Sequence, residues 1–269
     1  MCFYYAVVKT NANVLIDNKI ITEKQLDLFQ EKQFVKGFDY PLMPVISNDK
    51  PEEIQLFRWG FVPPHTRSIE KAQEFLSRYN TLNAKAETLF QSRLFSDSIQ
   101  KKRCLVLCSG FFEWRHKEPG KRNTEKYPFY VSLKDEGMFV FGGIWEQFTD
   151  QSTGEVISTY AIITTPANEM MELVHNSKKR MPLIIEPENA LKWLDSNLSE
   201  DDIKSFLQPF DTSRLKARPI KKINPRLQYE NDPGITVYYQ YDELQSLMQQ
   251  HPEYFEKSAD LRGSSPTLF

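Results

Sequence analysis

The 269-residue chain is 40% hydrophobic and 26% charged, which is the composition of an ordinary globular protein with ample length for a sizeable core. A formal net charge of −2 excludes a general electrostatic affinity for nucleic acid, so any such affinity must come from a local basic cluster. Three cysteines form no even disulfide framework and indicate reduced thiols. With no secretory signal and no apolar run near the roughly 20 residues of a membrane helix, we expect a soluble cytoplasmic protein without a membrane partner.

Short segments rich in β-branched and aromatic residues alternate with helical patterns along the chain. We expect strands over residues 3–8, 54–59, 103–108, 128–133, 138–145, 157–164, 214–220 and 235–239. We expect helices over residues 23–34 (after a capping box of Thr22 and Gln25), 84–94, 166–174 (opened by Thr165–Pro166), 188–196, 200–207 and 242–250. Because the order is not a strict βαβ alternation, the pattern favours an α+β fold. We expect one domain over residues 1–250 and a flexible tail over 251–269.

Cys2 is set apart by its position, because removal of Met1 would leave it as the first residue. An N-terminal cysteine carries an α-amine with a reference pKa near 8 beside a thiol near 8.5. This 1,2-aminothiol can condense with an aldehyde to a Schiff base, and the sulfur can then close a thiazolidine ring. A small residue at a frayed terminus is the simpler interpretation, but the strand expected at 3–8 would hold Cys2 against the body of the protein.

Glu113 lies among three aromatic residues in the segment 103–115, where loss of water should raise its pKa toward that of a general acid/base. From this segment alone an outward-facing carboxylate is equally compatible. Cys104 and Cys108 alternate onto one face of the expected strand, which indicates core positions. They lack a matching pair of ligands elsewhere, so we expect no metal site.

His175 follows the helix expected at 166–174 and has the pKa range needed for proton transfer near neutrality, although a lone histidine is more often structural. Lys178, Lys179 and Arg180 follow it closely as a basic cluster. A longer basic stretch spans residues 214–226 and contains no acidic residue. It fits either a phosphate-docking strip or a solvated strand face.

With these residues placed, the chain resembles the SOS response-associated peptidase (SRAP) family of abasic-site processing proteins. The resemblance runs from Cys2 to about residue 240, and its motifs stand in the family's order. After the Met1–Cys2 start these are PLMPVI (41–46), RWGFVP (58–63), LNAKAETLF (82–90), RCLVLCSGFFEW (103–114) and RMPLII (180–185). Each motif is weak alone, but six in order are a specific signature.

The resemblance implies a single β-rich SRAP-type domain with peripheral helices and a positively charged cleft leading to Cys2. It implies four catalytic residues: Cys2 as nucleophile, Asn83 holding the amine or the sugar, Glu113 as general acid/base, and His175 assisting proton transfer. The DNA-binding residues that it implies are Pro44, Trp59, Lys85 and Arg180. No metal or organic cofactor is implied.

Four features depart from the family's pattern. Phe3 and Tyr4 follow Cys2 where the family usually has Gly-Arg, and Lys85 replaces an arginine, which keeps the charge but loses the bidentate fork. Leu107 stands where proline or a small residue is common. His175 lies five residues before Arg180 instead of two, which indicates a short insertion, NSKK.

The resemblance implies that Cys2 forms a covalent thiazolidine crosslink with abasic sites in single-stranded DNA, as part of a DNA damage (SOS) response. We therefore expect a monomer that associates with the nucleoid on DNA damage, and a site able to cleave its own Met1–Cys2 bond as a protease. Two alternatives remain. An N-terminal-nucleophile amidohydrolase also begins with cysteine, and a non-enzymatic single-stranded DNA binder could use the basic stretch alone.

Overall fold

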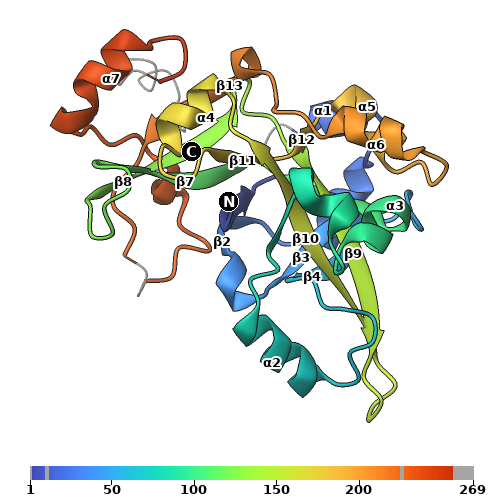
Figure 1. Cartoon of the computed structure of the whole chain (residues 1–269). Coiled ribbons are helices and arrows are strands. Elements are labelled where there is room, and N and C mark those ends of the chain that lie inside the picture. Colours follow the sequence, from blue (N-terminus) through green and yellow to red (C-terminus); the bar gives the residue numbers. More distant parts are fainter. Residues whose placement is uncertain (1, 10–11, 225–226, 257–269) are drawn as a thin grey trace.

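Two β-sheets form the body of the protein in a computed structural model that describes residues 2–9, 12–224 and 227–256 (Figure 1). Their strands are β1 (Tyr4–Val7), β2 (Lys32–Lys36), β3 (Leu42–Ser47), β4 (Gln55–Trp59), β5 (Asn83–Lys85), β6 (Arg103–Cys108), β7 (Gly110–His116), β8 (Lys126–Leu133), β9 (Phe139–Thr149), β10 (Val156–Pro166), β11 (Arg180–Pro182), β12 (Ile184–Ile185) and β13 (Leu215–Pro219). The helices are short and peripheral: α1 (Asn13–Asp17), α2 (Ile69–Arg78), α3 (Ser96–Lys101), α4 (Glu169–Val174), α5 (Pro187–Trp193), α6 (Glu200–Phe206) and α7 (Gln245–Gln250).

Five strands of the larger sheet close into a ring. The order β10–β4–β3–β6–β9 returns to β10, because β9 and β10 pair over most of their length. Closure leaves these five strands without an open edge between them. The strands β11 and β5 extend the ring from β10, and β12 extends it from β9. The structure is thus a barrel-like body with attached strands.

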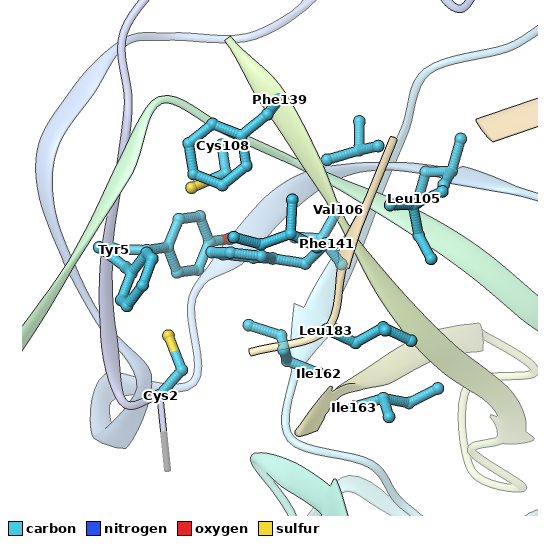
Figure 2. Packing of buried hydrophobic residues seen from close by; sticks show 14 of the residues in the cluster. Cys2, Tyr5, Leu105, Val106, Cys108, Phe139, Phe141, Ile162, Ile163 and Leu183 are labelled. Carbon is cyan, nitrogen blue, oxygen red and sulfur yellow. The ribbon is translucent and has the colours of Figure 1, made fainter. Parts of the chain in front are cut away.

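The smaller sheet is antiparallel, in the order β13–β8–β7–β1–β2, and it carries the N-terminus near its middle. One of its faces, with Tyr5, Phe111 and Val131, packs into the main hydrophobic core against the barrel. The other face, with Ala6 and Phe112, forms a second cluster beneath the segment that follows β13. Figure 2 shows Cys2 at the margin of the main core with its sulfur turned inward.

The α+β class and the single β-rich domain are confirmed, and most of the expected strands lie within a few residues of their predicted bounds. No helix among the described residues has both the length and the apolar character required to cross a membrane.

Four element predictions were wrong, and in each case pairing or packing outweighs the local pattern. Residues 23–34 give a single 3₁₀ segment, Glu23–Leu28, and then enter strand β2, because β2 pairs with β1. The capping box nevertheless forms, with the Thr22 amide donating to Gln25 Oε1 at 2.7 Å. Residues 84–94 begin in strand β5, which pairs with β10, and continue as 3₁₀ helix.

The helix expected from Thr165–Pro166 starts later, because both residues continue strand β10, which pairs with β11. Asn168 caps α4 instead, its side chain accepting from the Met171 amide at 2.9 Å. The strand expected at 235–239 is a 3₁₀ turn, Pro233–Thr236, followed by a single bridge from Ile220 to Tyr238.

The basic stretch on and after β13 is largely neutralised by carboxylates. These ion pairs join Arg214 to Glu186, Lys216 and Arg218 each to Glu136 and Glu256, and Lys222 to Glu125. Arg226 lies outside the described residues. A phosphate would have to compete with these internal partners, so the stretch is a weaker candidate for DNA docking than its sequence indicates.

Glu256 and its neighbour Phe255 belong to the segment that we expected to be a flexible tail. Phe255 is buried and bridges Ala217, and the Glu256 amide donates to the Ala217 carbonyl at 3.1 Å. This part of the expected tail is therefore packed against β13, and residues 257–269 lie outside the described residues.

Arg103 is a fully buried arginine that ties β6 to α3 and to the end of α5. Its Nε donates to the Trp193 carbonyl at 3.0 Å, its Nη1 to the carbonyls of Ile99 and Gln100 at 3.0 and 2.7 Å, and its Nη2 to the Asp195 carbonyl. Buried carbonyls that lose their donors are costly, which explains why the RC motif begins with arginine.

We therefore expect Arg103→Leu to lower the free energy of unfolding by about 3 kcal/mol or more, since several carbonyls would lose a charged donor at once. Urea denaturation measures this change. The matched control is Arg122→Leu, because Arg122 is exposed. Equal stability of the two variants would contradict the role assigned to Arg103.

Candidate functional site

Cys2 precedes β1 and is completely buried. Its thiol donates a hydrogen bond to the Tyr4 carbonyl, with 3.7 Å between the sulfur and the oxygen. Burial raises the pKa of this thiol, and the Glu113 carboxylate raises it further. The sulfur is therefore protonated at neutral pH, and any reaction that uses it as a nucleophile needs a neighbouring base.

The pairing of β1 with β7 brings Glu113 to the N-terminus. Tyr5 lies opposite Phe111 in this antiparallel register, so extending it by two residues brings Glu113 level with Phe3. Only 4% of Glu113 is exposed, and burial raises its pKa to about 7. This pKa suits a general acid/base near neutrality, as the aromatic surroundings of Glu113 in the sequence indicate.

His175 ends α4 and faces Glu113, with 3.6 Å between His175 Nδ1 and Glu113 Oε2. Burial lowers the pKa of His175 to about 4, so at neutral pH the two groups form no ion pair but a neutral imidazole beside a carboxyl group. His175 Nδ1 lies 2.9 Å from the Arg180 carbonyl, which can only accept a hydrogen bond. The proton is therefore on Nδ1, which leaves Nε2 as the basic nitrogen.

The insertion NSKK is a turn that keeps His175 and Arg180 in contact despite their longer spacing. The amides of Lys178 and Lys179 both donate to the His175 carbonyl, and Lys179 has a left-handed backbone with φ of 49°. Asn176 fastens the turn to β7, since its side chain accepts from the His116 amide at 2.9 Å and donates to the His116 carbonyl at 2.8 Å. Sequence reasoning missed this anchor, although its signal was present as an asparagine directly after His175.

Asn83 connects the barrel to the N-terminus. It stands at the start of β5, and its Nδ2 donates to the Cys2 carbonyl at 2.8 Å. Its Oδ1 is buried and has no hydrogen-bond partner among the described residues. The structure thus brings Cys2, Glu113, His175 and Asn83 together from four separate segments, which is the set that the resemblance implies.

Lys85 and Arg180 lie beside this group. Lys85 is exposed two residues after Asn83 on β5. The Arg180 guanidinium pairs with Glu87 and donates to the Thr164 carbonyl and hydroxyl. These two basic side chains flank the site, and the positively charged cleft that we expect there remains a prediction.

Trp59 and Pro44 occupy different surroundings from those expected of DNA contacts. Trp59 is fully buried, donates its indole N–H to the Leu82 carbonyl at 2.9 Å, and packs against the rings of Tyr5 and Tyr160. Pro44 is buried in β3. In this conformation neither residue offers a surface to DNA, and Trp59 instead supports strand β1 behind Cys2.

The chain belongs to the SOS response-associated peptidase (SRAP) family, whose model matches residues 1–224. The relatives that carry the name abasic site processing protein include one from a bacterium and one from a yeast. YoqW of Bacillus subtilis is 32% identical over 183 residues, covering 68% of this chain and 75% of the relative. The Saccharomyces cerevisiae protein YMR114C is 32% identical over 196 residues, covering 71% of this chain and 48% of the relative.

A crystal structure of a protein from Bacteroides thetaiotaomicron has the same fold, with a TM-score of 0.75 and 34% sequence identity. The match covers 89% of this chain and all of that chain.

The shifted pKa values of Glu113 and His175 predict opposite pH dependences of stability. The pKa of Glu113 rises from 4.5 to about 7 on folding. The stability lost by burying this carboxyl group therefore grows as pH rises from 4.5 to 7. The pKa of His175 falls from 6.5 to about 4 on folding. The stability lost by burying this imidazole therefore grows as pH falls from 6.5 to 4. Each group contributes about 3 kcal/mol at most.

We therefore expect His175→Asn to lose stability relative to Glu113→Gln as pH rises from 4 to 7. The first variant keeps Glu113, whose burial destabilises more at higher pH, and the second keeps His175, whose burial destabilises more at lower pH. Urea denaturation at several pH values measures the difference, in which contributions from all other groups cancel. Parallel stability curves for the two variants would show that folding does not shift the pKa values of these two groups in opposite directions.

Proposed function

We propose that this protein traps abasic sites in single-stranded DNA by a covalent bond to Cys2, after Met1 has been removed. The observation that carries the proposal is the position of Cys2 beside Glu113, His175 and Asn83, which surrounds an N-terminal aminothiol with proton-transfer groups. The abasic-site names of relatives from the same family support the choice of substrate.

An abasic deoxyribose exchanges between a closed hemiacetal and an open aldehyde. In the proposed reaction the Cys2 amine adds to the aldehyde carbon C1′, and loss of one water gives the imine. The thiol then adds across the C=N bond, its proton goes to nitrogen, and a thiazolidine ring closes without a leaving group. No oxidant, metal or organic cofactor is needed for this sequence.

Each buried group has a task in this sequence. Glu113, protonated below its pKa of about 7, donates the proton that opens the sugar ring and removes water from the carbinolamine. His175 Nε2, which is unprotonated at neutral pH, is the acceptor for the proton that leaves the amine as it adds to C1′, and the thiol passes its own proton to the imine nitrogen as the ring closes. Asn83 fixes the Cys2 carbonyl and so orients the amine.

Lys85 and Arg180 are the side chains we propose for phosphates next to the lesion, on the basic rim of a cleft that leads to Cys2. Trp59 and Pro44 act from the core by supporting the site. An unpaired strand is the expected substrate, because a buried nucleophile reaches an abasic sugar more readily without a second strand. We propose that the protein acts as a monomer on cytoplasmic or nucleoid DNA after damage.

Met1 lies outside the described residues, and the proposal requires its removal. The family's peptidase name suggests that the site itself cleaves the Met1–Cys2 bond, and an ordinary aminopeptidase could do the same.

Substitution of Cys2 distinguishes an imine, which needs only the α-amine, from a thiazolidine, which also needs the thiol. We expect Cys2→Ser to form an imine with an abasic oligonucleotide that survives a denaturing gel only after borohydride reduction, because a hydroxyl closes a less stable ring than a thiol. Wild-type protein should give a stable band without reduction. Cys104→Ser is the control, since Cys104 is a buried core thiol. A Cys2→Ser crosslink as durable as the wild-type one would refute the thiazolidine.

Glu113→Gln tests the proton donor. We expect crosslinking to slow by about 100-fold, within the usual contribution of a general acid/base. The wild-type crosslinking rate should peak between about pH 7 and 8, where Glu113 is still partly protonated and the α-amine is partly neutral. The rate of the variant should show no such peak and should only increase with pH up to the pKa of the α-amine. Gel time courses measure both, with Glu74→Gln on the exposed face of α2 as control. An unchanged pH profile would exclude Glu113 as the donor.

A further inference from the structure

A pocket of about 540 Å³ opens between β1, β2 and the segment that follows β13. Its wall includes four aromatic side chains and its rim carries lysines. The aromatic residues are Tyr4, Phe34, Trp114 and Tyr229, and the lysines are Lys32 and Lys36. A volume of this size accommodates a ligand of nucleoside dimensions.

The aromatic rings form one connected wall. Tyr4 stacks on Phe34 with centroids 5.2 Å apart and an interplanar angle of 20°, and it meets the edge of Trp114 at 4.9 Å. Tyr229 meets Phe34 in an edge-to-face arrangement, with centroids 6.0 Å apart and an interplanar angle of 76°. All four residues are only partly buried. The wall thus offers π-faces to a planar guest instead of being sealed inside the core.

The pocket and the reactive site lie on opposite faces of the same two strands. Tyr4 and Trp114 belong to the second hydrophobic cluster, whereas Tyr5 and Phe111 face the main core that includes Cys2. Trp114 directly follows Glu113 along β7. Tyr4 is close enough for the Glu113 carboxylate to raise its pKa, after burial and Asp39. A strand of DNA that passes the end of β1 therefore meets both.

The charges in the pocket are balanced. Lys32 pairs with Glu230, and Lys36 lies 3.3 Å from Asp39. A site for phosphate alone would present unbalanced positive charge. This pocket is better matched to a flat, uncharged ring that enters it while the attached phosphate stays at the rim of the pocket. Aromatic side chains bind nucleobases by stacking with little sequence preference.

We propose that this pocket holds an unpaired nucleobase of the DNA strand next to the abasic site. The inference rests on the proposed function, and it names a second subsite that holds the strand while the sugar reacts. The stacked base anchors the strand without base-specific hydrogen bonds, so damage is recognised in any sequence context.

Equilibrium binding tests this subsite in a Cys2→Ala background, which prevents the covalent step. The probes are single-stranded oligonucleotides with one abasic site and either normal neighbours or base-free tetrahydrofuran neighbours on one side. We expect the loss of the base on one side to weaken binding by about 5-fold or more, and Tyr229→Ser to remove this sensitivity. Tyr229→Phe should keep it, and so should Tyr79→Ser, because Tyr79 is exposed at the end of α2.

Tryptophan fluorescence gives a second readout that does not depend on the Tyr229 variants. Of the four tryptophans, Trp59, Trp145 and Trp193 are buried, so Trp114 is the one accessible to a stacked base. Single-stranded oligonucleotides should quench the emission of the protein, and Trp114→Phe should abolish the quenching. Quenching that persists in Trp114→Phe would overturn the proposal.

The outcomes separate the two proposals. If wild-type protein crosslinks abasic DNA on a denaturing gel but neither neighbouring base affects binding, the pocket assignment is wrong and the function stands. If the neighbouring base matters and Tyr229→Ser removes its effect while no crosslink forms, the pocket binds a base and the covalent reaction is wrong.

Discussion

The pairing of β1 with β7 is the constraint on which the site depends. A residue this close to a terminus is ordinarily mobile, but the strand after Cys2 is held between β7 and β2 in a five-stranded sheet. Tyr5 then packs against Trp59, and its hydroxyl lies 2.9 Å from that of Tyr160 in the barrel. Because both sheets hold β1, Cys2 has a fixed position relative to Glu113, and Asn83 completes the attachment.

Burial has the same chemical effect on every ionisable group of the site, since it disfavours the charged form. The Cys2 thiol stays protonated, His175 stays neutral, and Glu113 is balanced between its two forms near pH 7. A preformed thiolate would be prone to oxidation and to unwanted addition. A neutral site instead becomes nucleophilic only when an aldehyde is present and protons can move, which suits the proposed trapping of an abasic sugar.

Much of the site could be predicted from sequence, because its residues lie in short motifs whose chemistry depends on residue type. The aromatic neighbours of Glu113 correctly indicated a desolvated carboxylate, and Cys104 and Cys108 are core residues as expected. What failed depended on long-range pairing. Residues 23–34 carry a sound helix signal, yet β2 is required beside β1. No local pattern distinguishes a tryptophan that faces DNA from one, such as Trp59, that supports the site from below.

Charge along the sequence was the least reliable guide, because its partners lie far away in the chain. The stretch from 214 to 226 looks like a phosphate strip, but Glu136 and Glu256 pair with Lys216 and Arg218 across 80 and 38 residues of sequence. With Arg214, Lys216, Arg218 and Lys222 paired, the stretch has little excess charge with which to hold a polyanion, in keeping with the net charge of −2 of the chain. On the proposed function, affinity for DNA would then come from contacts close to the lesion, and the proposed stacking of a neighbouring base would supply such a contact without relying on salt-sensitive attraction.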